Sequence, residues 1–97
     1  MSTLHVLSHS PFGDDRLTSC LRLLGSADAV LLSGDAVYAL QPDTAPFSAL
    51  QERPINVFVL VEDAQARAIA IPDWAKAIDY PAFVELSIHH AKVNSWL

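Results

Sequence analysis

The feature that most constrains the fold of this chain is a series of short apolar runs separated by segments of helical character. Runs at residues 4–7, 29–32, 55–61 and 77–78 are expected to form strands. Continuous apolar runs are typical of strands buried on both faces of a parallel sheet. Their alternation with helices predicts an α/β fold, a single three-layer domain over residues 1–97 with a mostly parallel sheet of four or five strands. The β-branched run at 55–61 is expected to lie deepest.

The clearest helix is predicted to start at Asp14. Its apolar side chains recur with helical spacing on one face: Leu17, Cys20, Leu21 and Leu24. Asp14 and Asp15 are expected in the first turn, where the helix dipole favours acidic residues, and Gly25 follows the end. Residues 35–40 are apolar enough for a strand, but an N-cap residue and two alanines favour a short helix there. Further helical segments are predicted at 47–51 and 64–70. A last helix is predicted from 79 or 80 towards 90, with Pro81 near its first position. The tail after it is apolar, and no element is assigned to it.

In such sheets, ligands and chemistry occur outside the carboxyl ends of the strands. Turn-forming or acidic residues follow the first three predicted strands, at 8–13, 33–35 and 62–63. These three segments are therefore expected to meet at one edge. The acidic pair Glu62–Asp63 suits either acid–base chemistry or a solvated helix cap.

Composition limits the partners of the chain. The 97 residues leave room for one domain, and 6 basic against 11 acidic side chains give a net charge of −5. We therefore expect no direct nucleic-acid binding, which needs a basic surface. Only 18% of the residues are charged and 52% are hydrophobic, against roughly 25% charged residues in an average domain. A small domain cannot bury all of that apolar surface, so part of it is expected to contact a partner protein.

No apolar run is long enough for a membrane span, since the best is residues 57–61. The first residues lack a cationic segment followed by an apolar stretch, so no secretion signal is predicted. Cys20 is the single cysteine, which excludes an internal disulfide and fits a reducing compartment. We therefore expect a cytoplasmic protein without a membrane segment.

Cys20 has two interpretations. Its place on the apolar face of the helix is typical of a core cysteine. As a nucleophile it would need a pKa lowered by a nearby cation, for which Arg16, one turn earlier, is the candidate. Without a second cysteine, any persulfide formed here must be resolved by another protein.

Other motifs are weak. His5 and His9 flank a strand end, and His89–His90 are adjacent on a helix, so none has the spacing of a metal site. The three glycines fit neither a dinucleotide-binding fingerprint nor a phosphate-binding loop. Neither a metal nor a cofactor is expected. Trp96 at the terminus is expected either to dock on the domain or to insert into a partner.

Several stretches, taken in order, resemble the DsrH/TusB family of small sulfur-relay subunits. They cover nearly the whole chain: Leu4-His5, Ser10-Pro11-Phe12, Gly34-Asp35-Ala36-Val37-Tyr38-Ala39, Val57 to Leu60, Asp63, Ala66-Arg67, Ile78-Asp79-Tyr80, Phe83-Val84, Val93 and Ser95-Trp96-Leu97. One departure is Ala68, where the family commonly has glycine. It affects the turn after the preceding helix.

The resemblance implies a subunit of a cytoplasmic hetero-hexamer with TusC/DsrF-like and TusD/DsrE-like sister subunits. Such complexes take persulfide sulfur from an upstream carrier protein and pass it to a downstream one, without cofactors. In the TusBCD branch the sulfur reaches the 2-thio group of the tRNA wobble uridine. In the DsrEFH branch the complex serves dissimilatory sulfur oxidation. Our first hypothesis is a subunit of the tRNA 2-thiolation relay, and the sulfur-oxidation branch is the alternative.

The main acceptor cysteine of these complexes lies on a sister subunit. Cys20 matches a first-helix cysteine of the DsrH branch and is thus a candidate secondary persulfide site. The alternative is a purely architectural subunit whose Cys20 is core packing.

Overall fold

The strands form one sheet, seen in a computed structural model that describes residues 2–96. In chain order they are β1 (Thr3–Leu7), β2 (Ala29–Leu32), β3 (Asn56–Leu60), β4 (Ala75–Ile78) and β5 (Lys92–Trp96). The order across the sheet is β4-β3-β2-β1-β5, and every neighbouring pair is parallel. The predicted α/β class is confirmed, with five strands and no antiparallel pair among the described residues.

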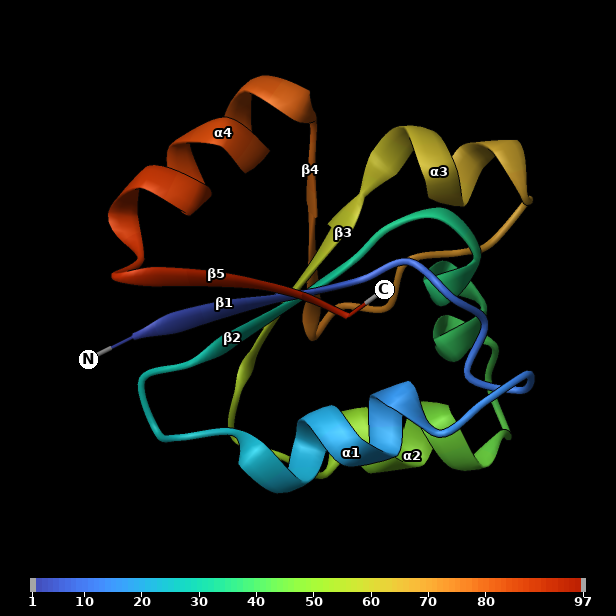
Figure 1. Cartoon of the computed structure of the whole chain (residues 1–97). Coiled ribbons are helices and arrows are strands. Elements are labelled where there is room, and N and C mark those ends of the chain that lie inside the picture. The colour runs from blue at the N-terminus through green and yellow to red at the C-terminus, as the bar shows by residue number, and fades with distance from the viewer. Residues whose placement is uncertain (1, 97) are drawn as a thin grey trace.

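Helices cover both faces of this sheet. They are α1 (Arg16–Leu23), the 3-10 helix η1 (Gly34–Leu40), α2 (Ala45–Gln51), α3 (Val61–Ala66) and α4 (Tyr80–His89). Figure 1 shows α1 and α2 together on one face and α4 on the other. The predicted three layers are therefore present. Helices η1 and α3 directly follow the carboxyl ends of β2 and β3.

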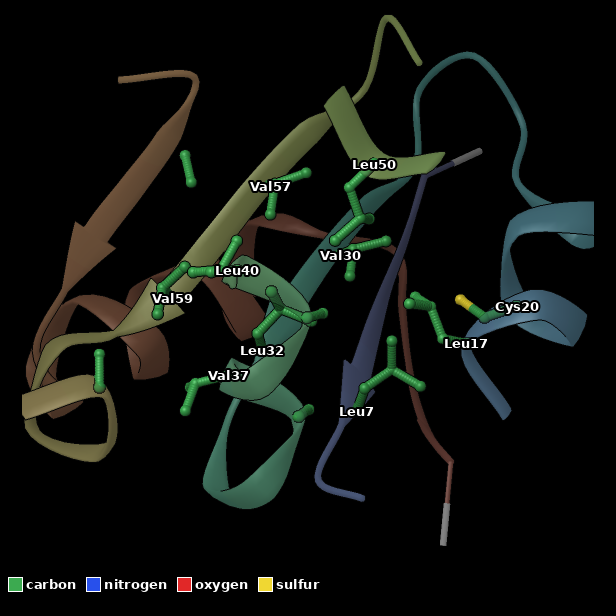
Figure 2. Packing of buried hydrophobic residues seen from close by; sticks show 14 of the residues in the cluster. Leu7, Leu17, Cys20, Val30, Leu32, Val37, Leu40, Leu50, Val57 and Val59 are labelled. Carbon is green, nitrogen blue, oxygen red and sulfur yellow. The ribbon is translucent and has the colours of Figure 1, made fainter. Parts of the chain in front are cut away.

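Each face of the sheet has its own hydrophobic core. The larger core packs side chains such as Leu7, Val30 and Val59 against α1, α2 and η1 (Figure 2). The smaller core contains Leu4, Leu31 and Leu60, with partly buried α4 side chains over them. All four residues of β2 are buried, and β2 is the central strand. The prediction that the 55–61 strand lies deepest is therefore wrong, and Asn56 in it is exposed.

Several predicted boundaries are also wrong. The helix predicted at 64–70 spans Val61–Ala66 as α3. The acidic Asp14 and Asp15 precede α1 instead of forming its first turn, and the Asp14 carboxylate accepts the backbone N–H of Arg16 at 3.0 Å. Strand β3 ends at Leu60, and Val61 already belongs to α3, with Glu62 in its first turn. The reason is that Val61 continues the apolar run of the strand, so the sequence pattern does not mark the change of backbone geometry.

The C-terminal tail forms strand β5, which was not predicted. It pairs with β1 at the edge of the sheet. Its residues 92–95 are exposed, so the strand lacks the buried apolar side chains that mark the others. Trp96 is the partly buried residue of the strand, and it packs against the larger core.

No helix within residues 2–96 is long and apolar enough to cross a bilayer.

Candidate functional site

Cys20 lies on the face of α1 that packs against the sheet. Its side chain is fully buried in the larger core, on the same helix face as Leu17 and Leu21 (Figure 2). The helical spacing of these residues is what directs the thiol inward. Cys20 is a free thiol.

The environment of Cys20 disfavours the thiolate. Burial, and to a smaller extent the Asp28 carboxylate, raises the pKa of the Cys20 thiol to about 12. The guanidinium of Arg16, the candidate cation, pairs with the Asp14 carboxylate. A persulfide-forming cysteine needs its thiolate and an open approach. In this conformation Cys20 has neither.

The carboxyl edge of the sheet brings together the three segments that the sequence predicted there. The Gly34 N–H donates to the Asp63 carboxylate at 2.8 Å, and the Ser33 hydroxyl donates to the Leu7 carbonyl at 2.9 Å. The Arg67 guanidinium lies 3.0 Å from the Asp35 carboxylate. Asp63 thus ties the loop after β2 to α3. The sequence allowed a solvated helix cap for the acidic pair, but the Asp63 carboxylate is partly buried and accepts the backbone N–H of Gly34 in η1 instead of capping α3.

The histidines do not converge. His9 is exposed and 3.4 Å from the Ser8 hydroxyl, while His90 donates from Nδ1 to the Leu86 carbonyl at 2.8 Å. His89 is exposed at the end of α4, and His5 is buried in β1. Over residues 2–96, no three His, Cys, Asp or Glu side chains are grouped as a metal site would require.

A partly buried network of hydrogen bonds joins Trp96, His5 and Asp28. The indole N–H of Trp96 donates to Nδ1 of His5 at 3.1 Å, and Nε2 of His5 lies 3.4 Å from the Asp28 carboxylate. Asp28 also accepts the backbone N–H groups of Thr3 and Gly25, both at 2.9 Å. The bond from Gly25 is the main cause that lowers the pKa of Asp28. Of the two expectations for Trp96, docking on the domain is therefore the one observed.

Sequence reasoning missed this hydrogen-bond network because its residues are far apart in the sequence. Trp96 and His5 are separated by 91 positions, and they meet only through the unpredicted pairing of β5 with β1. The available signal was a histidine inside an apolar strand, which needs a hydrogen-bond partner once it is buried.

Helix α4 presents an apolar surface to the outside. None of its residues is fully buried, and Tyr80, Val84 and Ile88 are 56%, 53% and 74% exposed. Their spacing of four residues aligns them in one row, which we call the α4 stripe. Val93 on the neighbouring β5 is 45% exposed and, through its register with Leu4, belongs to the same face of the sheet. Exposed apolar rows of this kind mark interaction surfaces.

Comparison with known proteins shows to which family this chain is related. The family model described as DsrH like protein matches residues 9–93. Protein TusB of Erwinia tasmaniensis is 40% identical over 95 residues, which cover 96% of this chain and 99% of that protein. Protein TusB of Yersinia pestis is 37% identical over the same shares. The crystal structure of the ychN protein from E. coli has the same fold, with a TM-score of 0.78, 18% identity and 99% and 100% of the two chains covered. On the family model and these nearly full-length relatives, the chain belongs to the DsrH/TusB family.

Proposed function

We propose that this chain is a subunit of a sulfur-relay complex that supplies sulfur for 2-thiolation of the tRNA wobble uridine. The observation that carries the proposal is the nearly full-length similarity to proteins named TusB. In this proposal it assembles in the cytoplasm with TusC/DsrF-like and TusD/DsrE-like sister subunits. Upstream and downstream carrier proteins deliver and receive the sulfur through the complex.

Within that complex we infer an architectural role for this chain. Cys20 is fully buried and its pKa is about 12, so the thiol is protonated near neutral pH. A sister subunit then provides the main acceptor cysteine. That Cys20 is a secondary persulfide site stays a prediction from the sequence. It requires an opening of the packing between α1 and the sheet before sulfur can reach it.

The α4 stripe supports the assembly part of the proposal. Permanent subunit interfaces are more hydrophobic than other surfaces and resemble a domain core cut in half. A row of exposed Tyr80, Val84 and Ile88 beside Val93 fits such an interface. We assign the contact with a sister subunit to this face.

The charge of the chain favours transfer through proteins over direct contact with tRNA. A net charge of −5 opposes binding to a phosphate backbone. In a relay the sulfur passes between proteins, so this chain has no need of its own nucleic-acid site. Dissimilatory sulfur oxidation by a DsrEFH-type complex is the alternative destination, and the name TusB of the relatives favours thiolation.

The test is complementation in a bacterium that lacks its own copy of this subunit, with the tRNA 2-thiouridine content measured by mass spectrometry. The proposal expects the chain to restore 2-thiouridine, and Cys20→Ala to restore it as well. Failure of the unchanged chain, expressed with its own sister subunits, contradicts the function. Restoration by the unchanged chain but not by a folded Cys20→Ala variant contradicts only the architectural role.

A second arm tests the α4 stripe. The double change Val84→Asp and Ile88→Asp places two carboxylates in the stripe, and we expect it to abolish co-purification with tagged sister subunits. Gln65→Asp on the exposed side of α3 is the matched control and should leave the complex intact. Co-purification of the double variant at the control level would contradict the assignment of this face.

A further inference from the structure

His5 is buried in β1, with 5% of its surface exposed, and both of its ring nitrogens have partners. Nδ1 lies 3.1 Å from the indole nitrogen of Trp96, and Nε2 lies 3.4 Å from the carboxylate of Asp28. The two rings are tilted by 39° with centroids 6.1 Å apart, so they meet at their edges rather than as a stack. The hydrogen bond is therefore the directional part of the contact.

The Trp96 bond determines where the proton of His5 sits. An indole N–H can only donate, so Nδ1 of His5 must present its lone pair. The neutral ring then carries its hydrogen on Nε2, directed at the Asp28 carboxylate. A second proton from solvent could bind only at Nδ1. It would place an N–H opposite the indole N–H, and the hydrogen bond would be lost.

The charged and titratable groups around His5 have opposite effects on the binding of a second proton to its ring. The Asp28 carboxylate, held by two backbone N–H groups, attracts a positive ring. Cys20 on α1, within electrostatic range of Asp28, is neutral because of its high pKa. Lys92 pairs with Thr3 on the same side of the sheet as His5 but is exposed, so solvent screens it. Trp96 is the neighbour whose contact cannot survive the second proton.

Trp96 is the residue through which strand β5 packs on the larger core. The strand lies at the edge of the sheet, and within residues 2–96 β1 is the strand that it pairs with. Residues 92–95 are exposed, so Trp96 supplies the packing of β5 on the larger core. Loss of the Trp96 bond would leave β5 held mainly by its backbone pairing with β1.

We propose that His5 and Trp96 form a pH-sensitive latch on the C-terminal strand. While Nδ1 of His5 is unprotonated, the indole bond holds Trp96 and β5 against the sheet. Protonation of Nδ1 breaks the bond and loosens β5, exposing the edge of β1. The proposal is independent of the sulfur-relay function, because it concerns only contacts within this chain.

Nuclear magnetic resonance on the full chain, followed from about pH 8 to about pH 5, tests the latch. We expect the Trp96 indole N–H resonance to move with the same midpoint as the His5 ring. The protection factors of the β5 amides, which correct for the pH dependence of intrinsic exchange, should fall several-fold below that midpoint, while those of the central β2 stay unchanged. Trp74 is an internal control, because its buried indole nitrogen has no hydrogen-bond partner among the described residues and its ring packs on Phe47. A Trp96 resonance and β5 exchange that do not change overturn the proposal, whether or not His5 titrates.

A variant pair tests the cause. Trp96→Phe keeps an aromatic ring but removes the donor, so the β5 amides should already be weakly protected at about pH 8 and should lose the pH dependence of their protection. Trp74→Phe removes the other indole and should leave the protection of β5 and its pH dependence as in the unchanged chain. A Trp96→Phe variant that keeps the pH dependence of β5 protection, or an equal loss in both variants, overturns the latch.

Discussion

The burial of Cys20 predicts a very slow reaction with thiol reagents. At about pH 8, a thiol with the ordinary pKa of 9.0 is about one-tenth thiolate, whereas a pKa of about 12 leaves about one molecule in ten thousand ionised. Because the thiolate is the nucleophile, ionisation alone slows alkylation roughly a thousandfold. Full burial adds the requirement that α1 open before the reagent can enter.

The assay follows alkylation by iodoacetamide through the intact mass of the folded chain. The matched control moves the cysteine two positions along the same helix, combining Thr18→Cys with Cys20→Ala, because Thr18 is exposed. When unfolded in urea, both proteins should react at the same rate. A difference between the folded proteins then comes from the fold and not from the reactivity of the cysteine itself. We expect the native chain to react at least a thousandfold more slowly than the control. A folded chain whose Cys20 reacts within tenfold of the control would refute the reasoning.

Three further predictions concern stability, each measured by urea unfolding. Ala68 has a φ of 54°, so Ala68→Gly should raise the free energy of unfolding by about 0.5–1 kcal/mol. Ala66→Gly, at the last residue of α3, should lower it by up to a similar amount, and two changes of the same sign would contradict this reasoning. Gly34 has a φ of 50° and a backbone oxygen 3.2 Å from the place of a Cβ, so Gly34→Ala should cost about 1–2 kcal/mol and Gly13→Ala close to nothing; equal costs would argue against strain. The pKa of Asp28 is lowered from its usual value of 3.8, so the ionised carboxylate stabilises the fold at a pH above that value. This stabilisation is lost as the pH falls below 3.8 and through the lowered pKa. Asp28→Asn should therefore reduce the fall of the unfolding free energy at acidic pH. An unchanged fall would contradict the stabilising role of the Asp28 carboxylate.

The central strands and α1 were predictable because local patterns encode them. Uninterrupted apolar runs produced β1, β2 and β3, and helical spacing placed Cys20 on a buried face. The meeting of three loops at the carboxyl edge followed from the parallel topology, which brings Gly34 and Asp63 together. These features need no knowledge of distant contacts.

The edge strand β5 and the hydrogen bonds that join Trp96, His5 and Asp28 were not predictable in the same way. Exposed residues at 92–95 carry no signal of burial, so the tail has no strand pattern. The contact between Trp96 and His5 exists only once β5 lies beside β1. Sequence patterns report burial and local geometry, and long-range partners of single polar side chains lie outside them.

The position of Ala68 was predictable from the sequence, but its backbone strain was not. The resemblance to the family marked this position as a departure from glycine, and the structure places it in a left-handed turn after α3. The sequence identified the place, but only the backbone angle shows that the alanine is strained there.

The most direct test of the account follows sulfur in the assembled complex. The chain is purified with its sister subunits, incubated with a persulfide donor, and the intact mass of every subunit is measured, with Cys20→Ala as the comparison. The account predicts that the mass of a sulfur atom appears on a sister subunit and not on this chain. It also predicts that omitting this chain abolishes the complex. A gain of sulfur on this chain that disappears in Cys20→Ala would contradict the architectural role and make Cys20 a station of the relay.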